Sequence, residues 1–277
     1  MDSFLNVLDG SPALEHLTLD QAGFSFSENP LHRKINLSHL LSLYIAYDAG
    51  LYIPYILSNI VLSPFTHASI ESFGWNSDSR GLLHCLPPDK TDLKMIDSVK
   101  HASLTREGGK YILLGRSSKS HTSKQKYLID IKADAGYLRQ AADFGTALVD
   151  LGLIFQDSPS LTGVSIRTPL EHLRKVDIED WVAVFSRLRL LTSVEFRQML
   201  NTGDDDHTDF EYTFCIRRFV EALKRTELVP QLEMLRLTYL HPVMLETLKL
   251  DLAKLLALRK TVCSAFGIRI GGQDWSP

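Results

Sequence analysis

At 277 residues, with 44% apolar and 23% charged side chains, the chain can bury a sizeable core, which excludes a disordered protein, a collagen and a small disulfide-framework protein. Its 30 basic and 33 acidic residues give a formal net charge of −3, so it lacks the excess positive charge on which non-specific phosphate binding depends. We therefore expect no nucleic-acid partner.

A six-residue pattern, L-x-x-L-x-L with other apolar residues at some positions, recurs along this leucine-rich chain. Such a recurrence is typical of stacked structural repeats. Clear copies of this hexad begin at Leu14, Leu40, Leu161, Leu191 and Leu232, and weaker copies with alanine in the middle position begin at Phe65 and Val99. The intervals between copies vary widely, so we expect an irregular array.

Each hexad predicts a short strand. Two apolar residues two positions apart point into one core, and the leucine three positions earlier brings the incoming chain to that core. Segments with helical spacing precede several hexads, so helix and strand alternate along the chain. This order predicts an α/β fold, specifically an irregular, horseshoe-like leucine-rich repeat solenoid with parallel strands on its concave face and helices on its convex face.

Two insertions interrupt the repeats. The β-prone runs Tyr111–Leu114 and Tyr127–Ile131 flank a polar segment without acidic residues, which predicts a hairpin near residues 110–132. Residues 201–209 predict an acidic surface loop. Because hexads occur on both sides of each insertion, we expect a single leucine-rich repeat domain that spans residues 1–277.

Helical periodicity is clearest in the C-terminal half. Ile178–Leu188 carries an apolar stripe, and Asp177 is suited to cap its N-terminus. A second stripe over Ile216–Leu223 predicts a helix that ends before Pro230.

The two ends of the chain differ in their predicted structure. A longer helix is predicted from Pro242 through Ala265, with Gly267 at its C-terminal cap, and residues 268–270 predict a short last strand. No element that would cap the first repeat is evident ahead of Leu14.

Fragments that match catalytic or metal-binding motifs lack the context that their chemistry needs. Asp143–Gly145 has the three letters of a kinase magnesium motif, but no catalytic loop or Gly-rich phosphate loop accompanies it. The aspartates within residues 204–209 lack the order of an EF-hand loop, and Gly115–Lys124 lacks the phosphate-loop sequence. We expect no catalytic residue, no metal and no cofactor, and the enzymatic alternative is a hydrolase whose residues are assembled in space.

Cysteine usage and hydropathy indicate the compartment. Cys85, Cys215 and Cys263 are odd in number and far apart, without the spacing of a zinc site. No window approaches the roughly 20 apolar residues that cross a bilayer, and Met1–Asp9 lacks a basic leader. We expect an intracellular protein, cytoplasmic or nuclear, with no membrane partner.

The side chains between the inward residues of each hexad should project from the concave face in rows about 4.8 Å apart. They are His16, Thr18, Asp20, Ser42, Tyr44, Ala46, His67, Ser69, Glu71, Gly163, Ser165, Arg167, Ser193, Glu195, Arg197, Met234, Arg236 and Thr238. Arginine, tyrosine and methionine are enriched at interfaces, so the predicted protein-binding residues are Tyr44, Arg197, Met234 and Arg236, together with Glu195 and His16. The alternative is a solvated face in which Glu195 pairs with Arg197 or Arg236.

Three stretches resemble a known family: Leu5–Leu19, Asn36–Ile45, and Val220–Leu237 with its Pro-Gln-Leu-Glu-Met-Leu-Arg-Leu ending. They are similar to the C-terminal leucine-rich repeats of the divergent F-box proteins that are abundant in fungi, and the resemblance covers nearly the whole chain. It implies the substrate receptor of a ubiquitin ligase, in which an F-box docks to the Skp1 adaptor of a cullin ligase while the repeats hold the target.

The resemblance leaves the ligase connection open, because no F-box precedes the hexad at Leu14. We hypothesise a truncated gene product, a fragment or a paralogue without ligase coupling. We expect a non-catalytic solenoid that binds a protein target on its concave face, with a Skp1-type adaptor as partner only if an F-box lies upstream. The alternative is a ligase-independent adaptor or scaffold that dimerises through an uncapped first repeat.

Overall fold

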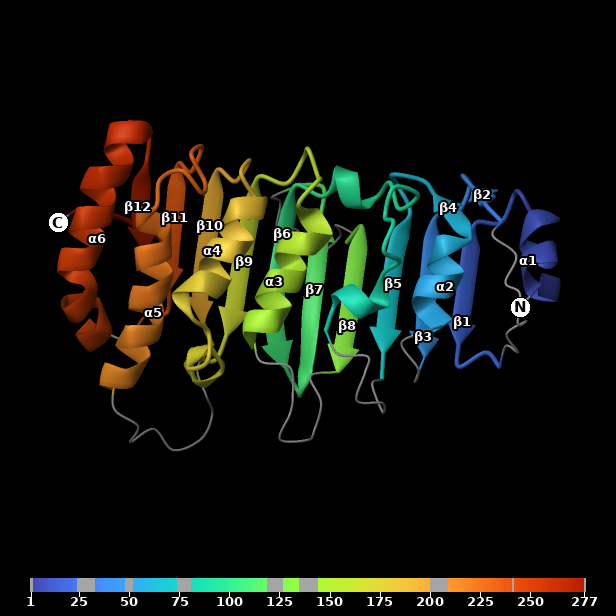
Figure 1. The fold of residues 1–277 in the computed structure, drawn as a ribbon, viewed down its shortest axis with the longest axis horizontal. Coiled ribbons are helices and arrows are strands. Elements are labelled where there is room, and N and C mark those ends of the chain that lie inside the picture. The colour runs from blue at the N-terminus through green and yellow to red at the C-terminus, as the bar shows by residue number, and fades with distance from the viewer. Residues whose placement is uncertain are drawn as a thin grey trace. The chain divides into compact units, whose positions relative to one another are not determined.

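A computed structural model describes residues 2–23, 33–47, 52–73, 81–118, 127–134, 144–199, 209–240 and 242–276. They form two compact units, each a mixed α/β structure with mostly parallel strands (Figure 1). The N-terminal unit comprises Met1–Lys100 with Gly109–Ala141, and the C-terminal unit comprises His101–Gly108 with Ala142–Pro277. The predicted α/β class is confirmed, and the single domain over residues 1–277 stays a prediction.

The sheet of the N-terminal unit has four parallel strands followed by one antiparallel strand. In order across the sheet they are β1 (His16–Asp20), β3 (Ser42–Tyr47), β5 (His67–Ser72), β8 (Ile129–Asp134) and β7 (Lys110–Arg116). β7 and β8 pair antiparallel, as the predicted hairpin near residues 110–132 requires. The tip of that hairpin, residues 119–126, lies outside the described residues, as does the predicted acidic loop up to residue 208.

The helices and strands in the segments that connect these strands are short. They include the helix α2 (Tyr52–Ser58), the 3₁₀ helices η1 (Leu83–Cys85) and η2 (Ile96–Ser98), and a small parallel sheet of β2 (Ile35–Leu37) and β4 (Ile60–Leu62). The prediction of a helix for each strand is therefore too simple here. Hexads only 26 and 25 residues apart leave little room for a long helix beside a strand and two turns.

An N-terminal helix, α1 (Asp2–Asp9), corrects the expectation of an uncapped first repeat. Its buried residues Leu5 and Leu8 are three positions apart and so lie on one helix face, and the helix packs against β2. Arg33 forms an ion pair with Asp9 and fixes the helix to the chain ahead of β2. The sequence signal was weak because two buried positions in a short helix do not establish a period.

The C-terminal unit has five parallel strands and a final antiparallel one among its described residues. In order they are β6 (His101–Glu107), β9 (Gly163–Thr168), β10 (Ser193–Gln198), β11 (Met234–Thr238), β12 (Gly267–Ile270) and β13 (Gln273–Trp275). The connections contain α3 (Phe144–Phe155), η3 (Leu170–Leu173), α4 (Ile178–Arg187), α5 (Asp209–Lys224) and α6 (Pro242–Val262). Figure 1 shows α3, α4 and α5 in front of the strands, so the helices cover one face of the sheet.

One predicted helix, α4, begins where its sequence signal indicates, and another, α5, ends where its signal indicates. Asp177 caps α4 in a capping box, in which its carboxylate accepts from Ile178 N at 2.8 Å and Asp180 accepts from Asp177 N at 2.8 Å. α5 ends at Lys224, ahead of Pro230 as predicted.

The C-terminal end differs from the prediction in two ways. α6 ends at Val262, and Gly267 is the first residue of β12 instead of the cap of the helix. β12 is also not the last strand, because Gly271 and Gly272 adopt φ values of 58° and 90° and turn the chain back into β13. Two consecutive left-handed residues suit a tight hairpin turn, and glycine adopts that conformation without strain.

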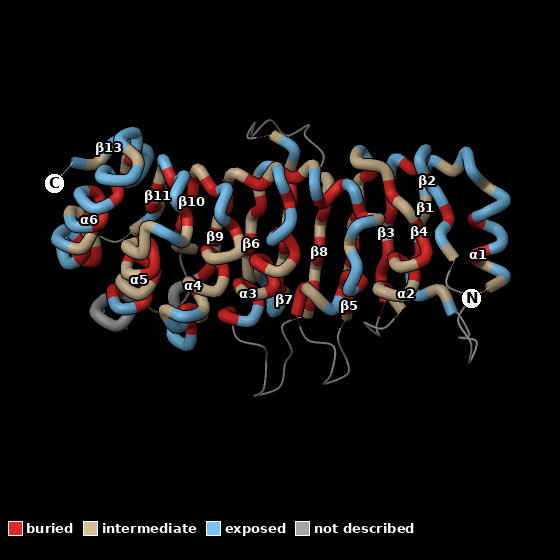
Figure 2. The backbone as a smooth tube through the Cα atoms, turned by 45° about the horizontal axis from the view of Figure 1, so that its top comes forward, coloured by how far each residue is buried: buried red, intermediate tan, exposed pale blue. Residues whose placement is uncertain are grey.

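The inward residues of the hexads form the core, and Figure 2 shows buried and partly exposed residues alternating along the strands. On β11, Leu235 and Leu237 are fully buried and lie in register with inward residues of β10. The structure corrects the first position of the weak hexad at Phe65. This side chain was expected to point inward but is 82% exposed. Thr66 is buried in its place, and its hydroxyl donates to Leu40 O at 2.8 Å.

A buried guanidinium joins α6 to the end of α5. Arg259 is only 1% exposed, and burial lowers its pKa to about 10, so it remains charged at neutral pH. Backbone carbonyls accept its hydrogen bonds, at 2.7 Å for Leu223 O, 2.8 Å for Val229 O, 3.3 Å for Arg225 O and 3.4 Å for Thr226 O. Arg225 O and Val229 O also accept from Leu228 N and Leu232 N. The carbonyl for which Arg259 matters most is therefore that of the buried residue Leu223, in the last turn of α5, where carbonyls lack partners within the helix.

The substitution Leu235→Ala should lower the free energy of unfolding by about 2 to 5 kcal/mol, since it removes a fully buried side chain and leaves a cavity. Urea unfolding measures the change. A loss below about 1 kcal/mol would contradict the inward assignment of this residue.

The substitution Arg259→Ala should destabilise the chain by about 3 kcal/mol, because Leu223 O loses its charged donor and the buried side chain leaves a cavity. Lys260→Ala, an exposed change on the same helix, is the control and should stay within about 0.5 kcal/mol. Equal effects of the two substitutions in urea unfolding would show that the carbonyls do not depend on Arg259.

Candidate binding surface

The strand registers align the predicted surface residues in rows. In the N-terminal unit, Thr18 pairs with Tyr44, and Tyr44 pairs with Ser69. In the C-terminal unit, Glu195 lies between its Cα partners Ser165 and Arg236. We call these outward positions the open sheet face. The six predicted binding residues fall into one group per unit: His16 and Tyr44 in the first, and Glu195, Arg197, Met234 and Arg236 in the second.

In the N-terminal unit, the charges near Tyr44 neutralise each other. Lys110 Nζ lies 2.6 Å from Glu71 Oε1 and 4.8 Å from the centre of the Phe73 ring. Tyr44 OH donates to Glu71 Oε2 at 3.5 Å. Burial, reinforced by the nearby Glu71 carboxylate, raises the pKa of Tyr44, so the phenol is neutral. His16, at the start of the same sheet, is exposed, and its Nδ1 lies 2.7 Å from Ser42 Oγ.

Asp130 on β8 is an unusual carboxylate in this unit. Its side chain is 16% exposed, Lys132 Nζ lies 3.6 Å away, and the buried Oδ1 atom has no hydrogen-bond partner among the described residues. Burial raises the pKa of Asp130, although Lys132 opposes that shift. The carboxylate is therefore held in a setting that favours its protonated form more than water does.

The group in the C-terminal unit is rich in arginine. Arg167 and Arg197 are direct cross-strand partners on β9 and β10, and Arg236 and Arg269 are partners on β11 and β12. Arg269 Nε donates to Asp274 Oδ1 at 2.6 Å. Arg167 Nε donates to the Ser165 hydroxyl at 3.3 Å.

Glu195 does not neutralise its arginine neighbours. Within the described part of the chain it forms no ion pair closer than 4 Å with Arg197 or Arg236. The predicted alternative, in which Glu195 pairs across strands with one of them, is not the arrangement in this structure. Arg236 likewise has no hydrogen bond or ion pair among the described residues.

Tyr239 extends the arginine-rich group beyond the end of β11. Its φ of 63° is left-handed, and its side chain is 54% exposed. The Arg197 guanidinium lies 4.8 Å from the ring centre and donates to the phenol oxygen at 3.3 Å. A bulky residue in this conformation is strained by about 1 kcal/mol or more, so an exposed one is an unusual feature. Sequence analysis missed it because Tyr239 lies outside the hexad.

Gly163 and His101 form a further feature that sequence analysis did not single out as a site. A Cβ atom on Gly163 would lie 2.2 Å from His101 Nδ1 and 2.9 Å from Ser193 Oγ. The imidazole thus occupies the space above the glycine, next to Ser193 on the neighbouring strand. The available signal was a glycine inside a strand, which often marks close approach of another group. Met234 lies on the next strand of this row.

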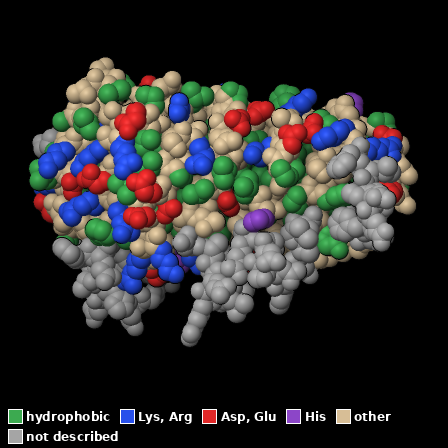
Figure 3. Space-filling view, viewed as in Figure 1, with side chains coloured by type: hydrophobic (Ala, Val, Ile, Leu, Met, Phe, Trp, Pro, Cys, Tyr) green, Lys and Arg blue, Asp and Glu red, His purple; other side chains and the backbone are tan. Residues whose placement is uncertain are grey.

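The helix face of the C-terminal unit has a different charge pattern, with Lys, Arg, Asp and Glu intermixed (Figure 3). Asp251 on α6 accepts from Arg217 at 2.9 Å and from Lys224 at 3.2 Å, both on α5. Arg225 pairs with Glu179 at 3.1 Å. These three cations on the helix face therefore each have a carboxylate partner, unlike Arg167, Arg197 and Arg236 on the open sheet face.

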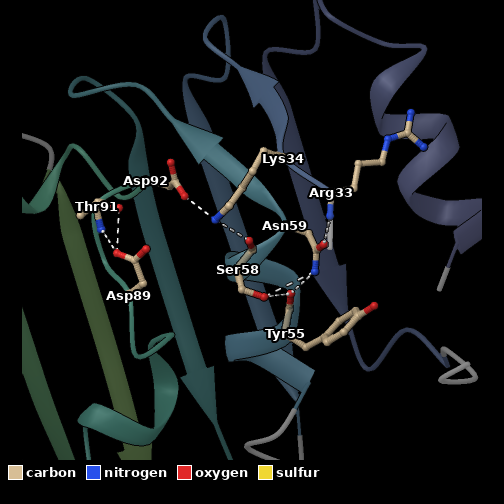
Figure 4. A network of polar contacts seen from close by, with 8 residues as sticks. All are labelled: Arg33, Lys34, Tyr55, Ser58, Asn59, Asp89, Thr91 and Asp92. Carbon is tan, nitrogen blue, oxygen red and sulfur yellow. Dashed lines mark hydrogen bonds and ion pairs between the residues drawn. The ribbon is translucent and has the colours of Figure 1, made fainter. Parts of the chain in front are cut away.

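A polar network in the N-terminal unit ties successive connections together (Figure 4). Asn59, which is 2% exposed, accepts from Arg33 N at 3.1 Å and donates to Tyr55 O at 2.8 Å. Lys34 donates to Ser58 O at 2.9 Å and forms an ion pair with Asp92. Because backbone groups take most of these bonds, the network serves the fold.

The motif fragments and the cysteines are the remaining groups that the sequence suggested as possible catalytic or metal-binding residues. Phe144 of the Asp-Phe-Gly fragment is fully buried at the start of α3, and Asp143 lies outside the described residues. Cys85, Cys215 and Cys263 are not joined in disulfide bonds. In the described ranges, no three His, Cys, Asp or Glu side chains gather as metal ligands, and no helix has the length and apolar character to cross a membrane.

A hollow of about 440 Å³ lies at the C-terminal ends of α3 and α4, away from the open sheet face. Phe155, Ser158, Arg187 and Leu190 are among its lining residues. Arg187 is engaged there, because its guanidinium donates to Ala183 O at 2.5 Å.

Comparisons of the chain with protein-family models, with curated proteins and with solved structures find no match.

The carboxyls of Asp130 and Asp251 should respond to pH with opposite sign. Burial alone would raise the pKa of Asp251, but hydrogen bonds from Lys224 and Arg217 outweigh it and hold that pKa below its ordinary value. Relative to an asparagine variant, Asp130 stabilises the fold below the ordinary pKa of 3.8 and loses this contribution as pH rises through its raised pKa. Asp251 gains its contribution as pH rises from its lowered pKa to the ordinary value of 3.8, and keeps it at higher pH.

Urea unfolding of Asp130→Asn and Asp251→Asn between about pH 3 and about pH 7 measures both effects. With rising pH, the native protein should lose stability relative to the first variant and gain it relative to the second. If the stability difference changed in the same direction with pH for both variants, the environments assigned to Asp130 and Asp251 would be wrong.

Proposed function

We propose that the chain is a non-catalytic, protein-binding leucine-rich repeat solenoid of the kind that recognises targets for F-box ubiquitin ligases. The resemblance of its leucine hexads to the repeats of divergent F-box proteins motivates the proposal. Parallel strands that recur with each hexad, and connections that return on one side, are consistent with such an array.

The open sheet face carries the proposed binding function. The registers bring Glu195, Arg197, Met234 and Arg236 onto two adjacent strands, and all four side chains are partly exposed. Arginine, methionine and tyrosine are types that contribute strongly to protein interfaces. The single observation that supports this function best is that the partly exposed Arg167, Arg197 and Arg236 form no ion pair among the described residues. By contrast, Arg217, Lys224 and Arg225 on the helix face pair with carboxylates.

In this proposal the protein works in the cytoplasm or nucleus, where cysteines that form no disulfide stay reduced. Coupling to a Skp1-type adaptor would require an F-box joined to these repeats. Without one, the chain would act as an adaptor or scaffold that holds its target and leaves ubiquitin transfer to other proteins.

The double substitution of Tyr44 and Arg236 to alanine tests the binding face. Peptides selected on the purified native chain from a displayed random library should bind the variant at least about tenfold more weakly, as measured by calorimetry. The melting temperature should change by less than about 2 °C, because neither side chain is part of the core.

The matched control is Lys254→Ala with Lys260→Ala, two exposed positions on α6. Binding by this variant should equal that of the native chain. Selected peptides that bind the Tyr44 and Arg236 variant as tightly as the native chain would overturn the assignment of the open sheet face.

A further inference from the structure

Four arginines on adjacent strands of the C-terminal unit define what we call the arginine face: Arg167, Arg197, Arg236 and Arg269. Neighbouring strands are about 4.8 Å apart, so the cross-strand partners Arg167 and Arg197, and likewise Arg236 and Arg269, place like charges side by side. Like charges directly opposite each other destabilise a sheet. Two such pairs on one face are therefore a cost to the fold that folding alone does not explain.

The surrounding carboxylates neutralise only part of this charge. Asp274 pairs with Arg269, and Glu195 lies in the row of Arg236 without a close ion pair among the described residues. The rows that contain the four arginines thus hold two carboxylates. Arg167 and Arg197 make polar contacts only with hydroxyl groups among their described neighbours.

Tyr239 supports one edge of the arginine face. Its ring lies under the Arg197 guanidinium at 4.8 Å, which orients the planar head group beside the sheet. The left-handed backbone that presents this ring is strained, and such strain concentrates at functional positions. An exposed aromatic ring against an arginine combines two residue types that dominate binding energy at interfaces.

We propose that the arginine face binds an acidic, Asp- or Glu-rich segment of the target protein. Each guanidinium can donate two parallel hydrogen bonds to a carboxylate, and a bound acidic segment would remove the repulsion between the arginine pairs. An extended segment of about eight residues is long enough to cross β9, β10, β11 and β12. The inference rests on the proposed function, because it names the chemistry of the partner that the open sheet face would hold.

Fluorescence anisotropy with the full chain tests the proposal. The probe is a labelled peptide of about eight residues with Asp or Glu at alternate positions, compared with its Asn and Gln counterpart. The acidic peptide should bind at least about tenfold more tightly, and its affinity should fall as NaCl rises from about 0.05 M to about 0.2 M. Equal binding of the two peptides would overturn the proposal.

Two variants with the same loss of charge locate the contact. Arg167→Gln with Arg236→Gln should weaken binding of the acidic peptide about tenfold, whereas Lys254→Gln with Lys260→Gln on α6 should change it less than about twofold. Equal losses in both would show a general charge effect and overturn the site. Tighter binding of a phosphorylated peptide or a single-stranded oligonucleotide to the same arginines would overturn the choice of partner.

Tyr239→Gly provides a variant that should not threaten the fold, because glycine adopts the left-handed backbone without strain. This variant should bind the acidic peptide more weakly, while its melting temperature stays unchanged or rises. An unchanged affinity would show that Tyr239 is not part of the site. If the acidic peptide does not bind but binding of the library-selected peptides still depends on Tyr44 and Arg236, the proposed acidic specificity is wrong and the proposed function stands. Failure of both experiments would overturn both.

Discussion

The parallel register of the strands is the constraint on which the core and the candidate surface both depend. Because side chains alternate with a period of two, the register that aligns Leu235 with Val194 inside the sheet also aligns Arg236 with Glu195 outside it. A shift by one residue would bury the arginines and expose the leucines. The large free energy of burying the apolar positions therefore fixes the geometry of the open face, although the outward residues contribute little to stability themselves.

Sequence analysis located the strands well where burial alone decides the pattern. The hexads at Leu14, Leu161 and Leu191 correspond to β1, β9 and β10 because alternate apolar residues need one buried face. It missed α3, most of whose residues are buried, because a helix with a buried surface nearly all round has no apolar stripe. Phe65 was wrong for a related reason: an apolar side chain at the first hexad position need not point inward when Thr66 can fill that place through a hydrogen bond.

The candidate site was predictable as a set of positions but not as an electrostatic arrangement. The outward residues follow from the hexad, whereas their neighbours come from strands many residues away, and the partner of each charge depends on side-chain direction as well as register. Glu195 illustrates the limit, since its Cα partner is Arg236 and yet no ion pair forms between them in the described structure. Tyr239 shows another, because a left-handed backbone at a strand end leaves no mark on apolar periodicity.

Arg259 shows how this fold treats a charge that it needs. Its guanidinium donates to carbonyls in and after the last turn of α5. On the helix face, Arg217, Lys224 and Arg225 pair with Asp251 or Glu179. The same chain leaves Arg167 and Arg197 next to each other, and neither forms an ion pair with a carboxylate among the described residues. Since the fold supplies acceptors where a charge serves stability, the arginines without them are better explained by an acceptor that arrives with a partner.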